Sequence, residues 1–388
     1  MVALAVAEEG KVLYVATELG LQASTDGGDN WNYIGGDFDA LGAPPVVSLA
    51  VDPRFCGCLY AGTAPGPKGG LYVSRDGGRH WQRLFAGRRD DGVRAILVAS
   101  RPGLLYISTY FHDGVGDELL VTNDGGQSWR TLLTDSGWHA QKFYALLPGE
   151  GSRLYVASSL GILVSTDGGE HFRNTSNPNS PVYGVAAGQR GLTERYDPLY
   201  VSGQRGLTTS LDGGTSWRSL AALPLTACHT LGPGSLAATT VRLPSLLVAT
   251  RSLCRGTAAK VYALVAGQGT RSQSWLEVGA GLPSVPDIRL VVAGTAQPRV
   301  YALSASGLWS LDLPAPPMPA TATPDPGVTV FAEGWPELAP SAPVEVAVPQ
   351  GEVKETAVGH ALDYVLLFGA LPLGGFFALR WLIRRSGW

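Results

Sequence analysis

The side chains best suited to catalysis are five acids in two short stretches of the chain. Two carboxylates about 5 to 10 Å apart can hydrolyse a glycosidic bond, one as an acid and the other as a base or nucleophile. The five candidates are Asp90, Asp91, Asp113, Asp117 and Glu118. They come from adjacent parts of the chain, they suit solvated loops, and the spacing of the last three matches no standard calcium loop. We therefore expect neither a catalytic pair nor a metal site here.

Four cysteines are the other candidate metal ligands. One residue separates Cys56 from Cys58, which is too close a spacing for the usual zinc knuckle. Cys228 and Cys254 are distant in sequence from this pair. We expect no metal and no cofactor. Two readings stay open for the later pair, namely a disulfide, which would indicate an oxidising compartment, and reduced, half-buried thiols.

A different set of aspartates recurs in one motif, Ser/Thr-x-Asp-Gly-Gly-x-x-aromatic, which we call the box. The boxes contain Asp26, Asp76, Asp124, Asp167 and Asp212, followed by Trp31, Trp81, Trp129, Phe172 and Trp217, and the aspartates are 43 to 50 residues apart. An Asp carboxylate accepts backbone N–H groups in a tight turn, paired glycines adopt positive φ, and the aromatic returns to the sheet as a buried anchor. The box is thus predicted to be a structural turn.

The elements that hold these turns are strands. About fourteen residues before each box stands Leu-Tyr with a small or branched residue, as in Leu13–Val15 and Leu154–Val156, which is typical of a strand. A repeat of this length predicts a β-propeller of four-stranded antiparallel blades. Five units are clear, at 1–36, 44–86, 92–134, 140–180 and 182–222, and two worn copies at Val261–Val265 and Val300–Leu303 make seven.

Two parts of the repeat are irregular. Unit six is long, and its extra apolar run Ser245–Thr250 suggests an inserted hairpin. Unit seven lacks an evident fourth strand, and an unclosed ring would leave a bare sheet edge. We favour Val328–Trp335 as the closing strand, with sequence upstream of Met1 as the alternative.

The boxes resemble those of Asp-box, or BNR, repeat propellers. This group includes sialidases, sortilin-type receptors, some glucanases and the photosystem II stability and assembly factor family. The resemblance covers roughly residues 1–313 and implies the fold. It implies little about function, because the box in these families is structural. The Arg-Ile-Pro segment that is usual in sialidases does not occur in the sequence.

Beyond the propeller, the chain changes character. Residues 314–361 form a linker with ten prolines up to Gln350, and residues 362–385 contain the apolar run Tyr364–Ile383, long enough to span a bilayer. Residues 386–388 form a short tail. Basic residues follow this helix and acids precede it, so the positive-inside rule predicts a cytoplasmic C-terminus and an extracytoplasmic propeller. No signal peptide is evident at the N-terminus, which leaves a tail-anchored protein with a cytoplasmic propeller as the alternative.

Two sets of residues are candidates for partner binding. The first combines exposed aromatics and cations on the loops opposite the boxes: Arg88, Arg89, Tyr110, Phe111, His112, Trp138 and His139. The second is a stripe of small residues in the predicted membrane helix, Ala370, Gly374 and Ala378, which would allow close packing against another helix.

Together these features predict a non-catalytic propeller anchored in a cell membrane by one C-terminal helix. We expect it to be an accessory, scaffold or assembly subunit of an integral membrane protein complex, and the family resemblance makes a photosynthetic or other bioenergetic complex the natural partner. The net charge of -3 gives no case for binding nucleic acid. The alternative is a surface glycan-binding protein or glycosidase.

Overall fold

A computed structural model describes residues 3–311 and 345–346 of the chain. Short gaps within this range are residues 18–19, 56, 88–89, 112–116, 135–141, 150, 176–179, 189–194, 233–234, 239–245, 267–272, 280–281, 283–284, 294–298 and 305–306. Residues 1–347 form one compact unit, and the account below concerns that unit.

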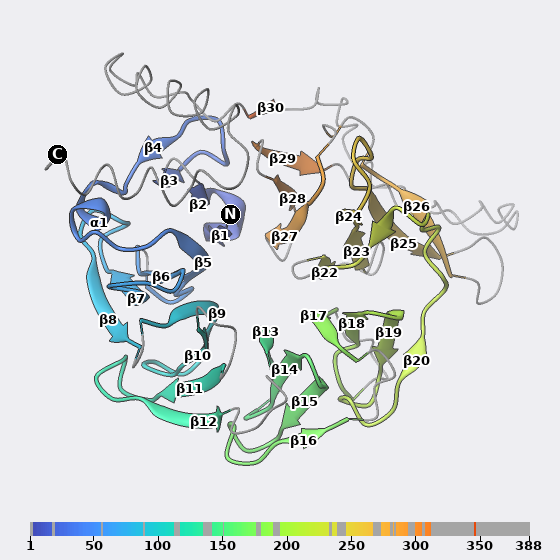
Figure 1. Ribbon diagram of the computed structural model, residues 1–388, viewed down its shortest axis with the longest axis horizontal. Helices are drawn as coiled ribbons and strands as arrows, with labels where there is room; N and C mark the ends of the chain where they lie inside the picture. The colour runs from blue at the N-terminus through green and yellow to red at the C-terminus, as the bar shows by residue number, and fades with distance from the viewer. Residues whose placement is uncertain are drawn as a thin grey trace, which may run out of the picture. The chain divides into compact units, whose positions relative to one another are not determined.

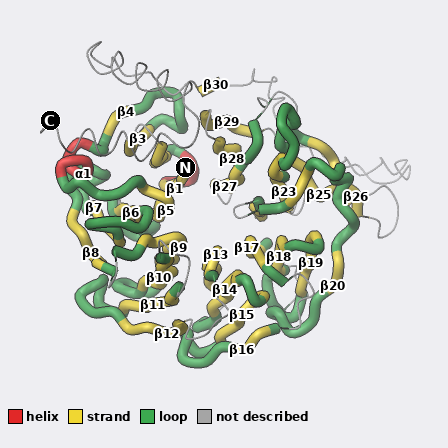
Figure 2. Tube along the Cα trace, viewed as in Figure 1, coloured by secondary structure: helices red, strands yellow, loops and turns green. Residues whose placement is uncertain are grey.

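Seven four-stranded antiparallel sheets form the blades of a β-propeller, which confirms the predicted fold and blade count. Figure 1 shows the sheets around a ring, with the first strand of each blade towards the centre. Figure 2 shows that, in the described part of the chain, helix is limited to α1 (Gly36–Ala40) and the short turn η1 (Glu8–Gly10).

The strands follow chain order within each blade. Blades one to three contain β1 (Ala3–Ala7), β2 (Val12–Thr17), β3 (Gly20–Ser24), β4 (Asn32–Tyr33), β5 (Val46–Val51), β6 (Leu59–Thr63), β7 (Gly70–Ser74), β8 (Gln82–Ala86), β9 (Gly92–Val98), β10 (Leu105–Tyr110), β11 (Glu118–Thr122) and β12 (Arg130–Thr134). Blades four and five contain β13 (Phe143–Pro148), β14 (Leu154–Ser158), β15 (Gly161–Ser165), β16 (Arg173–Asn174), β17 (Val182–Ala187), β18 (Leu199–Gly203), β19 (Gly206–Ser210) and β20 (Arg218–Ser219). Blades six and seven contain β22 (Leu236–Ala238), β23 (Leu246–Ala249), β25 (Val261–Ala266), β26 (Gln273–Glu277), β27 (Arg289–Ala293), β28 (Arg299–Ser304), β29 (Gly307–Leu311) and β30 (Glu345–Val346).

The middle strands of the blades are buried on both faces, because each blade packs between two neighbours. In blade four every residue of β14 and β15 is buried. This explains why these strands read as continuous apolar runs rather than as an alternation of apolar and polar residues.

Each box holds its turn by the same hydrogen bonds. The Ser or Thr hydroxyl donates to the box carboxylate at 2.7–2.9 Å and accepts the N–H of the second glycine at 2.8–2.9 Å. The carboxylate also accepts the N–H four residues after it, at 2.8–3.0 Å. These bonds favour the charged form, and that from the Asn30 N–H makes the largest contribution to lowering the pKa of Asp26.

The box also joins neighbouring blades. A Cβ placed on the second glycine of box three, Gly126, would lie 2.5 Å from Leu84 of blade two, and the φ of this glycine is +96°. Trp129 of the same box packs on the hydrophobic cluster that blades two and three share, and it meets Phe85 of blade two edge to face at 5.3 Å. Only Trp81 among the box aromatics is buried, at 6% exposed, while the other four are half-buried at blade boundaries.

Blade six differs from the prediction. The run Leu246–Ala249 is not an inserted hairpin but β23, the second strand of the blade, and Val261–Ala266 is the third. The insertion is instead a small sheet of β21 (His229–Thr230) and β24 (Arg251–Ser252), beside a disulfide between Cys228 and Cys254. The disulfide reading of these cysteines is therefore the one that the structure shows.

Blade seven is closed by β30, which pairs with Leu308 and Trp309 of β29. The favoured closing strand Val328–Trp335 is thus wrong for this edge, and those residues lie outside the described part of the chain. The strand β30 has only two residues, and so short a strand leaves no pattern in the sequence by which it could have been predicted. No helix among the described residues is long and apolar enough to cross a bilayer. The apolar run Tyr364–Ile383 lies outside them.

Candidate functional site

The propeller has two faces with different loops. In an antiparallel meander, the connections between second and third strands and those between blades lie at one end of the sheets, and the boxes lie at the other end. We call these the loop face and the box face. The loop face is the one on which the sequence placed its candidate residues.

A β-bulge recurs near the loop face in the first strands of four consecutive blades. The pairing of β5, β9, β13 and β17 with the following strand skips one residue in each blade. The skipped residues are Val47, Arg94, Tyr144 and Tyr183. Bulges redirect a side chain and are common beside functional sites. The fold therefore presents one equivalent position in blades two to five.

The bulge residues of blades three to five form a cluster of cation and aromatic rings. The Arg94 guanidinium lies 4.4 Å from the ring centroid of Tyr110 and 5.7 Å from that of Tyr144. Tyr144 in turn meets Tyr183 edge to face, with ring centroids 5.9 Å apart. We call these four residues the bulge cluster. All four are partly exposed, and Arg94 retains 26% of its side-chain exposure.

Asp117 fixes the position of Arg94. Its carboxylate is fully buried and accepts a hydrogen bond from Arg94 Nη1 at 2.6 Å and one from the Phe143 N–H at 3.3 Å. Arg94 Nη1 also donates to the Phe143 carbonyl at 3.4 Å, so blade three is bonded to blade four. Burial raises the pKa of Asp117, and the charge of Arg94 opposes that shift. The other acid oxygen, Oδ1, is buried and has no partner among the described residues.

The candidates from sequence fare unevenly. Tyr110 and Phe111 lie on the loop face, and Tyr110 enters the bulge cluster. The cations Arg88 and Arg89 and the residues His112, Trp138 and His139 lie outside the described residues. Among the candidate acids, Asp90 is exposed, Asp91 is buried and Asp113 is not described.

Sequence reasoning missed Arg94, Tyr144 and Tyr183. Their signal is a local pattern at the start of units two to five. A buried apolar residue precedes the bulge and a small residue follows it, as in Val93-Arg94-Ala95 and Val182-Tyr183-Gly184. An alignment of the units by this pattern, rather than by their boxes, would have found them.

The box face carries a separate groove, lined mainly by blades one and two and also by Ala238 of blade six and Val292 of blade seven. It encloses about 1490 Å³, and its lining includes Tyr33, Asp52, Arg54 and Phe55. Arg54 binds both oxygens of the Asp52 carboxylate, at 2.8 and 2.7 Å. The groove lies on the opposite side of the propeller from the bulge cluster.

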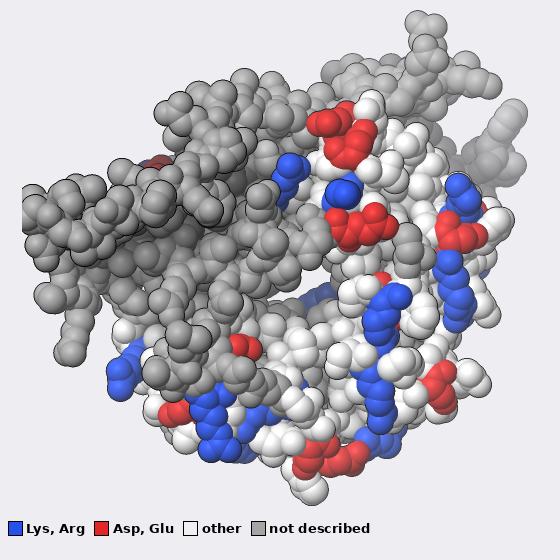
Figure 3. All heavy atoms as spheres, turned by 180° about the vertical axis from the view of Figure 1, so that it is seen from behind, with Lys and Arg blue, Asp and Glu red and all other residues white. Residues whose placement is uncertain are grey.

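Metal sites and nucleic acid sites both depend on clustered charges. No group of three or more His, Cys, Asp or Glu side chains within the described ranges is arranged to hold a metal ion. Figure 3 shows acidic and basic side chains interspersed over the visible part of one face. On that visible part, the two signs are mixed and form no single basic stripe.

Comparison by sequence identifies one informative relative. No protein-family model matches the chain. The photosystem II assembly lipoprotein Ycf48 of Synechococcus sp. (strain CC9902) is 26% identical over 214 residues, which are 53% of this chain and 57% of that protein. The matched region therefore spans little more than half the length of this relative.

Comparison by structure identifies propellers of enzymes. An ancestral GH74 enzyme has a TM-score of 0.56 at 16% identity, over 80% of this chain and 44% of that one. The GH74 xyloglucanase from Xanthomonas campestris has a TM-score of 0.56 at 17% identity, over 79% and 51%. At such identities the likeness shows the fold alone. The chain is thus similar in sequence to a photosystem assembly factor and in fold to a wider group of propellers.

Proposed function

We propose that this chain is a non-catalytic accessory subunit that assists the assembly of a photosynthetic membrane complex, and that its bulge cluster binds a protein of that complex. The similarity to an assembly lipoprotein supports the class of function. The observation that carries the binding site is the placement of Arg94 between two tyrosine rings by a buried carboxylate.

The chemistry of the bulge cluster suits a protein partner. Tyrosine and arginine are the side chains enriched in the energetic centres of protein interfaces. Arg94 is held in place before binding, so little side-chain entropy is lost when a partner arrives. Arg94 uses Nη1 for both of these hydrogen bonds, one to Asp117 of its own blade and one to the Phe143 carbonyl of blade four, and a guanidinium has five N–H donors. The remaining donors suit carbonyl or carboxylate oxygens of the partner.

Purification from native membranes in a mild detergent tests this function. Tyr183→Ser removes an outer ring of the cluster without touching the Arg94–Asp117 pair, and we expect it to reduce the co-purified complex at least tenfold. Val47→Ser is the matched control, because Val47 occupies the same bulge in blade two. Equal recovery of the complex with wild type and Tyr183→Ser would exclude the bulge cluster as the docking site.

The enzyme alternative is tested on the same protein. We expect no release of sugar from sialosides, glucans or xyloglucan. Asp117 is buried and paired with Arg94, so of the two acids only Asp90 is exposed to a substrate. Turnover that disappears in Asp90→Asn or Asp117→Asn would instead support a glycosidase.

The membrane anchor belongs to the same proposal. We propose that Tyr364–Ile383 spans the bilayer, with the propeller on the extracytoplasmic side, and that Ala370, Gly374 and Ala378 pack against a helix of the partner. Gly374→Ile adds bulk to this stripe and should release the complex while the chain stays in the membrane. Leu373→Ile, one position away, should leave the complex intact. If the complex still co-purifies with Gly374→Ile, the helix anchors the chain in the membrane but does not pack against the partner through this stripe.

A further inference from the structure

Blade six carries a compact lobe on the loop face that the proposed function does not use. It consists of residues 224–230, which enter the blade, and residues 251–257, which follow its second strand. We call it the stapled lobe, because β21 pairs with β24 and the Cys228–Cys254 disulfide joins its two segments, with Cα atoms 5.2 Å apart.

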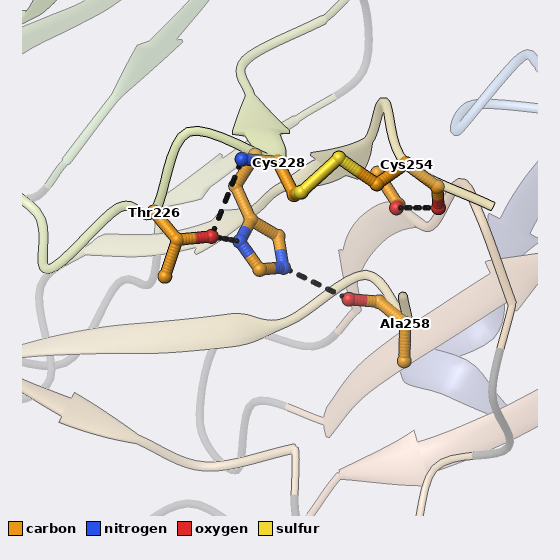
Figure 4. Close-up of a disulfide and its surroundings, with 6 residues drawn as sticks. Thr226, Cys228, Cys254 and Ala258 are labelled. Carbon is orange, nitrogen blue, oxygen red and sulfur yellow. Dashed lines mark hydrogen bonds between the residues drawn. A yellow bond between two sulfur atoms is a disulfide. The ribbon is translucent and has the colours of Figure 1, made fainter. Parts of the chain in front are cut away.

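Several further bonds brace the stapled lobe. The imidazole of His229 is buried, with Nδ1 2.7 Å from Thr226 Oγ1 and Nε2 3.0 Å from the Ala258 carbonyl. Figure 4 shows the Cys228–Cys254 disulfide close to Thr226 and Ala258, the two residues that bond this imidazole. The Leu253 N–H donates to the Cys228 carbonyl at 2.8 Å. The lobe is therefore a braced structure rather than a loose loop.

This brace exposes an apolar tip. Leu253 is 64% exposed, the highest value among the large exposed hydrophobic residues of the described chain, and Leu225 of the other segment is 37% exposed. Cys254 and Gly256 are exposed as well. Leu225 and Leu253 come from the two segments that the disulfide joins, so the apolar tip belongs to one braced lobe that also carries the charges described next.

The charge around the tip is basic. Arg251 and Arg255, both exposed, flank Leu253 and Cys254. The sequence from Gly213 to Leu276 contains six Lys and Arg and no Asp or Glu. The adjoining segment contributes Asp287, next to Pro286, whose carbonyl accepts the Ser252 N–H at 2.7 Å. Glu277 is engaged by Lys260 at 2.8 Å. The stapled lobe thus presents a leucine between two arginines with little acidic compensation.

We propose that the stapled lobe binds the surface of an anionic lipid bilayer. Leu253 enters the headgroup region, and Arg251 and Arg255 bind lipid phosphates while their aliphatic stems lie along the apolar layer. Leucine is under-represented among the energetic centres of protein interfaces, which favours lipid over protein as the occupant. This site is independent of the bulge cluster, which lies on other blades.

Radical footprinting of the full chain in lipid nanodiscs tests the proposal. Oxidation of the Leu253 side chain is measured by mass spectrometry in discs of phosphatidylcholine with and without phosphatidylglycerol. We expect oxidation to fall severalfold in the anionic discs only, and to recover at high salt. Leu211, 46% exposed in a box on the opposite face, is the internal control and should not change.

Two variants sharpen the result. Arg251→Gln with Arg255→Gln should weaken binding of the lobe to the anionic discs by on the order of fivefold for each charge removed, so that oxidation of Leu253 returns towards its value in neutral discs, with an unchanged melting temperature. Leu211→Arg, a surface change on the box face, should have no effect on it. Equal oxidation of Leu253 in both kinds of disc would overturn the proposal. Protection that requires the co-purified complex, whatever the lipid, would also overturn it and assign the lobe to a protein partner.

Discussion

The first residue of each box is a buried hydroxyl with two bonds. Thr122 is 1% exposed, donates to Asp124 and accepts the Gly126 N–H at 2.9 Å. Thr122→Val keeps the shape of the side chain but leaves that N–H buried without its acceptor. We expect a loss of about 1 to 3 kcal/mol in the free energy of unfolding, measured by chemical denaturation.

Thr122→Ser is the control for this change, since the other four boxes use serine at the same place. It should remain within experimental error of wild type. A Thr122→Val protein as stable as the serine variant would show that the hydroxyl is dispensable and that the glycines and the aromatic hold the turn.

Box two adds a titratable partner to this arrangement. His80 Nδ1 bonds the Asp76 carboxylate, and this bond raises the pKa of His80, with Asp37 acting in the same direction and Arg79 against it. A folded pKa above the unfolded value stabilises the fold fully below about pH 6.5, and the effect is lost as the pH rises through the folded pKa.

His80→Asn isolates this charge, because box one already has Asn30 at the same position, bonded to Asp26 at 2.7 Å. Wild type should melt slightly higher than His80→Asn at pH 5.5 and at the same temperature at pH 9. Because both side chains are exposed, the difference should shrink in salt. A difference that grows with pH would contradict the ion pair.

At the scale of elements, the strands around each box were predictable because their pattern is local. Leu-Tyr-Val, a turn with glycine and the box follow one another within thirty residues, and the structure has them in that order. The prediction failed where a unit lost its box. In blade six, Val261–Ala266 has the sequence pattern of a second strand. It is the third strand of the blade, and the disulfide-bonded loop separates it from the second strand, β23.

The candidate site was predictable only in part for a related reason. The predicted order of strands in each blade put Tyr110 and Phe111 on the loop between second and third strands, and β10 ends there in the structure. Arg94, Tyr144 and Tyr183 are the extra residues of β-bulges. Side chains alternate between the two faces of a strand, and an extra residue breaks that alternation, so the sequence pattern does not predict on which face these side chains lie. Their proximity depends on the ring, because Arg94 and Tyr144 are 50 residues apart in sequence and Tyr144 and Tyr183 are 39 apart.

The disulfide is the element that most constrains blade six. It closes a separation of 26 residues, a loop length for which crosslinking stabilises a fold by roughly 2 to 4 kcal/mol. A variant with Cys228→Ser and Cys254→Ser should lose about this amount in chemical denaturation. Wild type in a reducing agent should approach the same value.

Cys58→Ser is the matched control, because Cys58 is a free, half-buried thiol on a loop of blade two. It should change stability little, and a reducing agent should still destabilise it. If wild type and the double serine variant have the same free energy of unfolding in oxidising buffer, the disulfide is not needed. The pairing of β21 with β24 and the hydrogen bonds of His229 would then be enough to hold the lobe.

For the whole molecule, the ring must close between blades seven and one. Leu303 and Tyr301 of β28 form one buried cluster with Leu13 and Val15 of β2. The Tyr301 hydroxyl adds a bond to the Gly10 carbonyl at 3.3 Å. Segments almost three hundred residues apart in sequence thus share a core, and no repeat pattern in the chain encodes which blade meets which.

Because blades one and seven share this core, we expect a cavity in one of them to destabilise both. Leu303→Ala leaves a cavity between the first and last blades and should cost about 2 to 5 kcal/mol. Because the cluster is common to both, hydrogen exchange should accelerate in β2 of blade one as much as in β28. Leu264→Ala is the control, since Leu264 is equally buried but packs on blades five and six. It should open those blades and leave β2 protected. Faster exchange in β28 alone after Leu303→Ala would mean that the blades unfold one by one and that closure of the ring adds no cooperativity.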